Sequence, residues 1–72
     1  MPNHFARKKL PGSKWTQADF EARERHFVVH GWADPHISGS ELIKMEAVVT
    51  RRLFEINYKE LKDDSRWIMG WW

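Results

Sequence analysis

Aromatic residues set the strongest constraint on how this chain folds. Its 72 residues include five tryptophans, four phenylalanines and one tyrosine, but no cysteine. A chain of this length lies near the lower limit for a domain that folds alone, and without cysteine it has no disulfide or thiolate zinc site to support a small core. Each aromatic side chain can bury roughly 150–250 Å². We therefore expect one small domain with a largely aromatic core.

The charges are nearly balanced overall but unevenly distributed. The chain has 12 Lys and Arg residues against 10 Asp and Glu, yet residues 1–14 contain no acidic residue. Pro and Gly interrupt this segment and its apolar content is low, so we predict an irregular basic arm over residues 1–12 and a single domain over residues 13–72. The basic residues of this region are Arg7, Lys8, Lys9 and Lys14.

Alternation and composition predict two strands in the first half of the chain. Residues 13–17 form a short candidate strand in which Trp15 points away from its two neighbours. Residues 26–33 carry β-branched and aromatic side chains on both faces, which is typical of a central strand, and Gly31 is the expected position of a bulge or of a close backbone approach. The intervening segments are predicted to be a loop over residues 18–25, with one or two helical turns as the alternative, and a turn over residues 34–40.

Residues 41–60 allow two predictions. As two strands, apolar residues alternate along residues 43–49 and again along residues 54–58. As one helix, apolar residues recur every three or four positions after a capping-box pair. We predict two strands, because residues 48–50 (VVT) are poor helix formers. The difficulty is the connection at residues 50–52, which has no glycine or asparagine to adopt a positive φ.

The C-terminal segment is dominated by tryptophan, since three of the five lie in the last six residues. The aspartates at positions 63–64 provide an N-cap and Gly70 a stop for a short helical turn. In such a turn Trp67 and Trp71 share one face and close one end of the sheet. Trp72 is then the remaining candidate for an exposed contact.

Together these elements predict a mostly β fold. We expect a small antiparallel sheet of about four strands, with an SH3-like barrel as one candidate form, followed by a short C-terminal helical turn. No segment approaches the ~20 apolar residues that span a bilayer, and no apolar segment of a secretory signal follows the basic residues of the arm. Absence of cysteine is typical of a reducing compartment, so we expect a cytoplasmic protein without membrane contact, as a monomer or weak dimer.

Several separated blocks occur in a recognisable order: Ser13–Thr16, His26–Val29, Glu46–Arg52, Ile56–Asp63, then Trp67 and Gly70–Trp71. Over roughly residues 9–71 they resemble a small tryptophan-rich family of uncharacterised bacterial proteins. Tyr58 stands where that family more often has tryptophan, which keeps an aromatic ring at this position. The resemblance implies a cytosolic bacterial single domain and no particular reaction.

No catalytic or metal-binding pattern is visible. The chain has no cysteine nucleophile, no Gly-x-Ser-x-Gly elbow and no glycine-rich phosphate loop. His26 and His30 share a face of a predicted strand, but at ~3.3 Å per residue they lie about 13 Å apart, which is too far to chelate one ion. We therefore expect no enzyme activity, no metal and no cofactor.

Binding chemistry fits the composition better. Single-stranded nucleic acid is held by aromatic rings that stack on bases and by Lys or Arg that contact phosphates. We predict a non-catalytic interaction module that binds RNA or a ribonucleoprotein surface through its basic arm and aromatic-flanked arginines. The alternative is a protein–protein adaptor that uses exposed aromatic residues or a sheet edge. The candidate nucleic-acid-binding residues are Arg7, Lys8, Lys9, Lys14, Trp15, Arg51 and Arg52.

Overall fold

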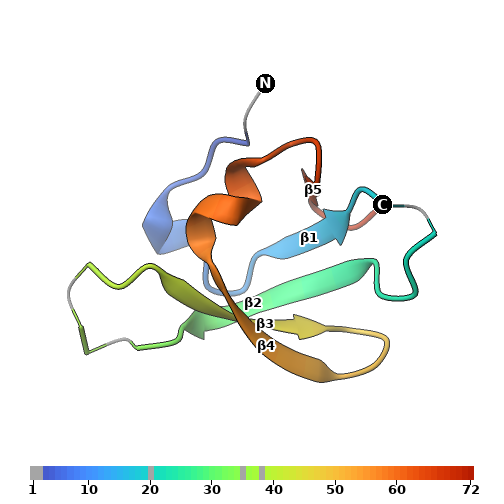
Figure 1. Ribbon diagram of the computed structural model, residues 1–72. Helices are drawn as coiled ribbons and strands as arrows, with labels where there is room; N and C mark the ends of the chain where they lie inside the picture. The colour runs from blue at the N-terminus through green and yellow to red at the C-terminus, as the bar shows by residue number, and fades with distance from the viewer. Residues whose placement is uncertain (1–2, 20, 35, 38) are drawn as a thin grey trace.

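The described residues form one open antiparallel sheet and two short 3-10 helices (Figure 1). This computed structural model of the chain describes residues 3–19, 21–34, 36–37 and 39–72. The strands lie in the order β4-β3-β2-β1-β5, and neighbouring strands are antiparallel. Their bounds are β1 (Lys14–Gln17), β2 (His26–Trp32), β3 (Leu42–Ala47), β4 (Arg52–Asn57) and β5 (Trp67–Met69); the 3-10 helices are η1 (Arg7–Lys9) and η2 (Tyr58–Lys62).

β2 occupies the centre of the sheet, as its apolar side chains on both faces predict. Phe27 and Val29 point into the core and are almost fully buried. The register against β3 shifts between Val29 and Gly31, and Gly31 has a φ of 152°. Glycine adopts this backbone geometry without the steric cost of a side chain. The predicted central strand and its bulge at Gly31 are confirmed.

Residues 41–60 contain two strands and not one long helix. β3 and β4 pair from Leu42↔Asn57 to Ala47↔Arg52, and the Arg51 N–H donates to the Ala47 carbonyl at 2.8 Å to close the turn. The turn between these strands has no glycine, and Arg51 adopts the positive φ instead, at 62°. The left-handed conformation costs a non-glycine residue roughly 1–2 kcal/mol, and the paired strands on either side hold it in place.

The predicted C-terminal helical turn is wrong, because Trp67–Met69 forms β5. This strand pairs along β1 from Gln17↔Trp67 to Trp15↔Met69 and satisfies backbone groups of β1 that would otherwise form a bare edge. The short helical element lies earlier in the chain, as η2. Its N-cap is Asn57, whose side chain accepts a hydrogen bond from the Lys59 N–H at 2.9 Å.

The three C-terminal tryptophans therefore have different environments. Trp67 is 6% exposed, and its ring lies edge-on to Phe27 with a centroid distance of 5.1 Å. Trp71 was expected to be buried beside it, but 44% of its surface is exposed, because β5 ends at Met69 and the chain turns at Gly70, which has a φ of 88°. Trp72, the remaining candidate for an exposed contact, is 74% exposed.

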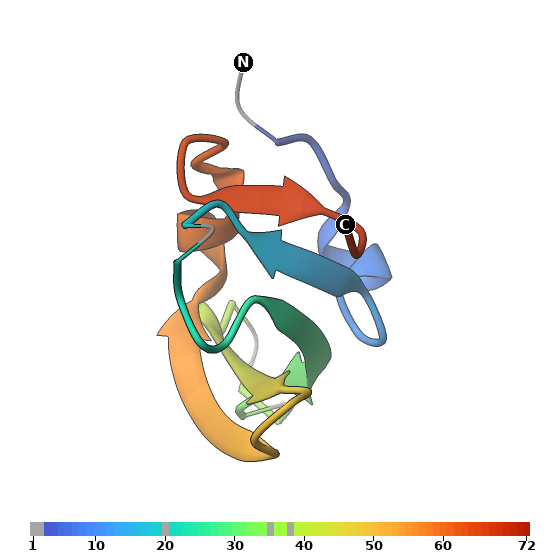
Figure 2. The same ribbon diagram turned by 90° about the vertical axis from the view of Figure 1, so that its right-hand side faces the viewer.

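The sheet is open and not an SH3-like barrel, and it has five strands where about four were expected. The edge strands β4 and β5 do not pair with one another in the described part of the chain. Figure 2 shows that the sheet nevertheless curls strongly, with β1 and β5 lying above the curved β3–β4 hairpin. The mostly β class is confirmed, and the loop over residues 18–25 contains no helix among its described residues. Phe20, Pro35 and Ser38 of the predicted connections lie outside the described residues.

The core lies on one face of the sheet, where the arm and η2 cover it (Figure 1). Leu10 of the arm is 1% exposed, and the Phe5 ring packs edge-on against Trp15 at a centroid distance of 5.6 Å. The Asn3 side chain donates to two carbonyls, those of Leu61 and Trp67, so the arm is attached to the domain along its length. The buried apolar residues are Leu10, Trp15, Phe27, Val29, Ile43, Met45, Ala47, Tyr58, Leu61 and Trp67.

Thr16 ties the C-terminal residues to the sheet and gives a test of the fold. Its hydroxyl is fully buried, donates to the Gly70 carbonyl at 2.7 Å and accepts from the Trp72 N–H at 3.0 Å. We expect Thr16→Val to lower the free energy of unfolding by about 1–3 kcal/mol, because it leaves two partly buried backbone groups without their partner. Urea unfolding measures this loss.

Thr16→Ser is the matched control, because it keeps the hydroxyl and removes only a methyl group. Hydrogen exchange should show the Trp72 amide losing protection in Thr16→Val and keeping it in Thr16→Ser. Equal protection of that amide in both variants contradicts the role given to the hydroxyl.

Candidate functional site

Arg7 anchors the basic arm to the domain. Its guanidinium carbon lies 4.2 Å from the ring centroid of Trp32 and 4.6 Å from that of Tyr58, and its Nη2 donates to the Ser40 carbonyl at 2.7 Å. Two aromatic faces and a carbonyl hold this side chain in one orientation. Arg7 is therefore occupied by contacts within the chain, although it is exposed like its neighbours on η1, Lys8 and Lys9.

Lys14 lies beside an exposed aromatic ring. Its Nζ is 4.7 Å from the ring centroid of Trp71, and the Trp71 Nε1 donates to the Phe27 carbonyl at 2.9 Å. The hydrogen bond fixes the indole, so its exposed part and the Lys14 ammonium group are presented together. Sequence reasoning singled out Lys14 but not this partner.

Trp72 continues the same surface and is held by its backbone. Its N–H donates to Thr16 Oγ1, and its main-chain oxygen lies 2.7 Å from Nε2 of His26. Its indole Nε1 donates to the Met69 carbonyl at 2.8 Å. Most of the ring remains exposed, so the tail offers a positioned aromatic face. We call Lys14, Trp71 and Trp72 the tail surface.

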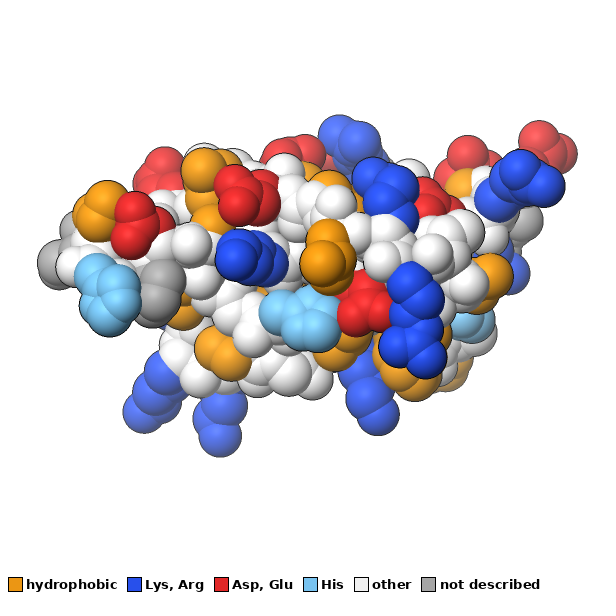
Figure 3. Space-filling view, turned by 90° about the horizontal axis from the view of Figure 1, so that it is seen from below, with side chains coloured by type: hydrophobic (Ala, Val, Ile, Leu, Met, Phe, Trp, Pro, Cys, Tyr) orange, Lys and Arg blue, Asp and Glu red, His pale blue; other side chains and the backbone are white. Residues whose placement is uncertain are grey.

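The exposed lysines of η1 shortly precede Lys14 in the chain. The Ser13 N–H donates to the Leu10 carbonyl at 2.9 Å, so a single tight turn separates η1 from Lys14 at the start of β1. Figure 3 views the molecule from below, where several Lys and Arg side chains project from its rim. Cations that project into solvent can contact the phosphates of a flexible strand.

Trp15 does not belong to this surface. It is 1% exposed, and its Nε1 donates to Ser13 Oγ at 2.9 Å. An indole enclosed in this way offers no face to a ligand. Trp15 is a core residue, and the period of two along β1 separates it from Lys14 on the opposite face.

The arginines at positions 51 and 52 lie at the other end of the sheet from the arm, in and after the β3–β4 turn (Figure 1). Arg51 is widely exposed and approaches Glu46 at 3.7 Å. Arg52 makes a two-pronged contact with Glu24, with Nη2 to Oε1 at 2.7 Å and Nε to Oε2 at 3.0 Å. The Arg52 guanidinium also lies 4.5 Å from the ring centroid of Phe54. Both arginines thus face acidic partners of the same chain.

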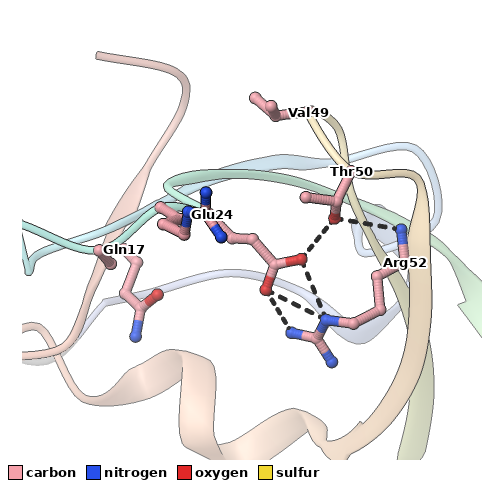
Figure 4. A pocket seen from close by; sticks show the side chains of 7 residues that line it. Gln17, Glu24, Val49, Thr50 and Arg52 are labelled. Atoms are coloured by element: carbon pink, nitrogen blue, oxygen red, sulfur yellow. Dashed lines mark hydrogen bonds and ion pairs between the residues drawn. The ribbon is translucent and has the colours of Figure 1, made fainter.

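Glu24 is the centre of the contacts at that end, as Figure 4 shows. Its carboxylate accepts hydrogen bonds from Arg52 and from the hydroxyl of Thr50. The hydrogen bonds from Arg52 and then from Thr50 lower the pKa of Glu24 from 4.5 to about 2, because they favour the charged carboxylate. Sequence analysis missed this residue, since nothing in the pattern of residues 18–25 indicates which acidic side chain meets the distant hairpin.

The histidines make local hydrogen bonds. Nε2 of His30 lies 2.6 Å from Oε1 of Glu46, and His26 contacts the backbone of Trp72. Within the described residues, no group of three or more His, Cys, Asp and Glu side chains is arranged to hold a metal ion, and no helix is long and apolar enough to cross a membrane.

The structure therefore divides the predicted site residues into separate groups. Lys14 belongs to the tail surface, whereas Lys8 and Lys9 lie on η1 beside the anchor Arg7, and Trp15 is core. The arginines at positions 51–52 lie apart from them. The tail surface could not be found from sequence, because the predicted helical turn placed Trp71 in the core.

Comparison with known proteins gives one match. A family model described as tryptophan-rich protein (DUF2389) matches residues 13–72 of the chain, and so leaves out the basic arm. No curated protein and no solved structure matches the chain.

The lowered pKa of Glu24 predicts a pH dependence of stability. A carboxyl whose pKa is lower in the folded chain contributes stability that is present above about pH 4.5 and is lost as the pH falls toward 2. We expect the wild-type chain to be more stable than Glu24→Gln near neutral pH and this difference to disappear near pH 2. Urea unfolding across this pH range measures it.

Glu21→Gln is the matched control, because Glu21 lies in the same loop and is exposed. Its removal should leave the acid dependence of the wild-type chain in place. A constant difference between the wild-type chain and Glu24→Gln at every pH would show that Glu24 is not stabilised as a carboxylate.

Proposed function

This chain belongs to the tryptophan-rich protein family DUF2389, and we propose that it is a non-catalytic module that binds single-stranded RNA on the tail surface. The observation that carries this proposal is the position of the Lys14 ammonium group 4.7 Å from the ring of Trp71, next to a second ring, Trp72, that is 74% exposed. A cation beside aromatic faces is the combination that holds unpaired bases and their phosphates.

The chemistry divides between the two kinds of side chain. The exposed rings of Trp71 and Trp72 stack on bases, and every base has a π-face, so stacking requires no particular sequence. The ammonium groups of Lys14, Lys8 and Lys9 contact phosphates along the strand. Arg7 supports this binding indirectly, because its contacts with Trp32 and Tyr58 hold η1 against the domain. An RNA partner and the lack of cysteine agree with a cytoplasmic protein.

Exposed surface elsewhere favours one alternative, a protein–protein adaptor. β4 is an edge strand, and Leu53 on it and Val49 in the preceding turn are 68% and 71% exposed. An extended peptide could pair with such an edge while its side chains cover the apolar residues. This alternative uses β4, which is the opposite edge of the sheet from β5, so variants separate the two functions.

A titration with labelled single-stranded RNA tests the proposal. We expect binding at low salt, with log affinity falling against log salt with a slope of about −2, because three lysines contact phosphates at about −0.7 each. Lys14→Gln should reduce that slope by about 0.7. Trp72→Ala should weaken binding roughly 5- to 150-fold, which corresponds to about 1–3 kcal/mol for one stacked base. Fluorescence anisotropy of the RNA measures the affinity, its salt dependence and the losses in the two variants.

Arg51→Gln is the matched control, since it removes one exposed positive charge that does not belong to the tail surface. It should bind RNA nearly as the wild-type chain does. No binding at low salt, or equal losses in Lys14→Gln and Arg51→Gln, would overturn the proposal. Loss of a protein partner in a Leu53→Ser variant would then support the adaptor role.

A further inference from the structure

A hollow on the core side of the sheet lies at the end opposite the arm. It has a volume of about 780 Å³ and is formed by the end of β1, the loop before β2 and the β3–β4 turn. Figure 4 shows the Glu24–Arg52 pair on one side of this hollow and Gln17 across a gap from it. A volume of this size is within the range of small-molecule sites. None of the residues of the tail surface lines it.

Arg52 is held in a fixed orientation at the wall of the hollow. Its Nε and Nη2 groups each donate a hydrogen bond to the Glu24 carboxylate. The Thr50 hydroxyl donates to the same carboxylate, and the Phe54 ring packs against the guanidinium. A guanidinium has five N–H donors. Nη1 and the second N–H of Nη2 make no hydrogen bond among the contacts of the described residues, so one two-pronged edge of this guanidinium remains for a ligand.

The charge and polarity of the hollow favour an anion. Arg23 lines it as a second cation, and Gln17 adds an amide donor. Glu24 is already matched by Arg52, so the two arginines and the one carboxylate leave a net charge of +1. Ala22 and Val49 supply apolar wall on which the organic part of a ligand can rest.

We propose that this hollow is a binding site for a phosphate monoester. A phosphate monoester has three terminal oxygens and carries up to two negative charges, which suits two guanidinium groups and an amide better than the two oxygens of a carboxylate do. The volume beyond Arg23 and Arg52 accommodates the group that the phosphate is attached to, such as a nucleoside. This site is independent of RNA binding on the tail surface, because the two share no residue.

Chemical-shift titration of the ¹⁵N-labelled full chain tests this site, with adenosine 5′-monophosphate, inorganic phosphate and acetate as probes. We expect both phosphate compounds to shift the backbone amides of Thr50 and Arg52 and the Arg52 Nε–H, the nucleotide more strongly, and acetate to have little effect. Arg23→Gln leaves the Glu24–Arg52 pair intact and should weaken nucleotide binding roughly 10- to 150-fold, the loss expected for one hydrogen bond to a charged group.

Two further variants separate this site from general electrostatics and from the RNA surface. Arg52→Lys keeps the charge but lacks the two-pronged edge, and it should weaken binding as Arg23→Gln does. Arg51→Gln removes an adjacent charge, and Trp72→Ala alters the tail surface; in both, the nucleotide should shift the Thr50 and Arg52 signals as it does in the wild-type chain. Absence of shifts, an equal response to acetate, or equal weakening by Arg51→Gln would overturn the proposal. None of these outcomes depends on whether RNA binds.

Discussion

Edge-to-face packing of aromatic rings is the interaction on which the rest of the structure depends. The Phe27 ring on the central strand contacts Phe54 of β4 at a centroid distance of 5.8 Å and Trp67 of β5 at 5.1 Å. It therefore joins the two edge strands of an open sheet through its core. Such pairs contribute about 0.5–1.5 kcal/mol beyond the area that they bury. In a chain without disulfides, these contacts explain how so few residues maintain a sheet that does not close.

The same aromatic residues determine where function can reside. Among the described residues, rings that face the core, such as Trp15, stabilise the fold, whereas Trp71 and Trp72 of the tail are exposed and can contact a ligand. The buried hydroxyl of Thr16 holds the tail in place through its hydrogen bonds with Gly70 and Trp72, although Thr16 has no direct part in binding. The exposed position of Trp71 is thus a consequence of strand pairing along β1.

Electrostatic partners divide the cationic residues in a way that net charge does not reveal. Arg7 faces two aromatic rings, and Arg52 faces a carboxylate whose pKa it lowers. Lys14 faces a ring that is itself open to solvent. A cation next to an acidic partner stabilises the fold and offers a ligand only its remaining N–H donors. A cation beside an exposed ring offers a ligand its full charge. The two proposed sites differ for this reason.

The local pattern of residues was sufficient to predict most of the strands of this protein. Alternation along residues 43–49 and 54–58 predicted two strands, apolar residues on both faces predicted that β2 is central, and the position of Gly31 predicted its bulge; these depend on neighbours within a few residues. Tertiary structure alone decided the last segment. Residues 63–70 carry good signals for a helical turn, but pairing with β1 satisfies more backbone groups and buries Trp67 against Phe27. The sequence by itself therefore determined a small aromatic β domain with a basic arm, and long-range pairing decided which tryptophans and arginines face solvent, because that depends on contacts between residues far apart in the chain.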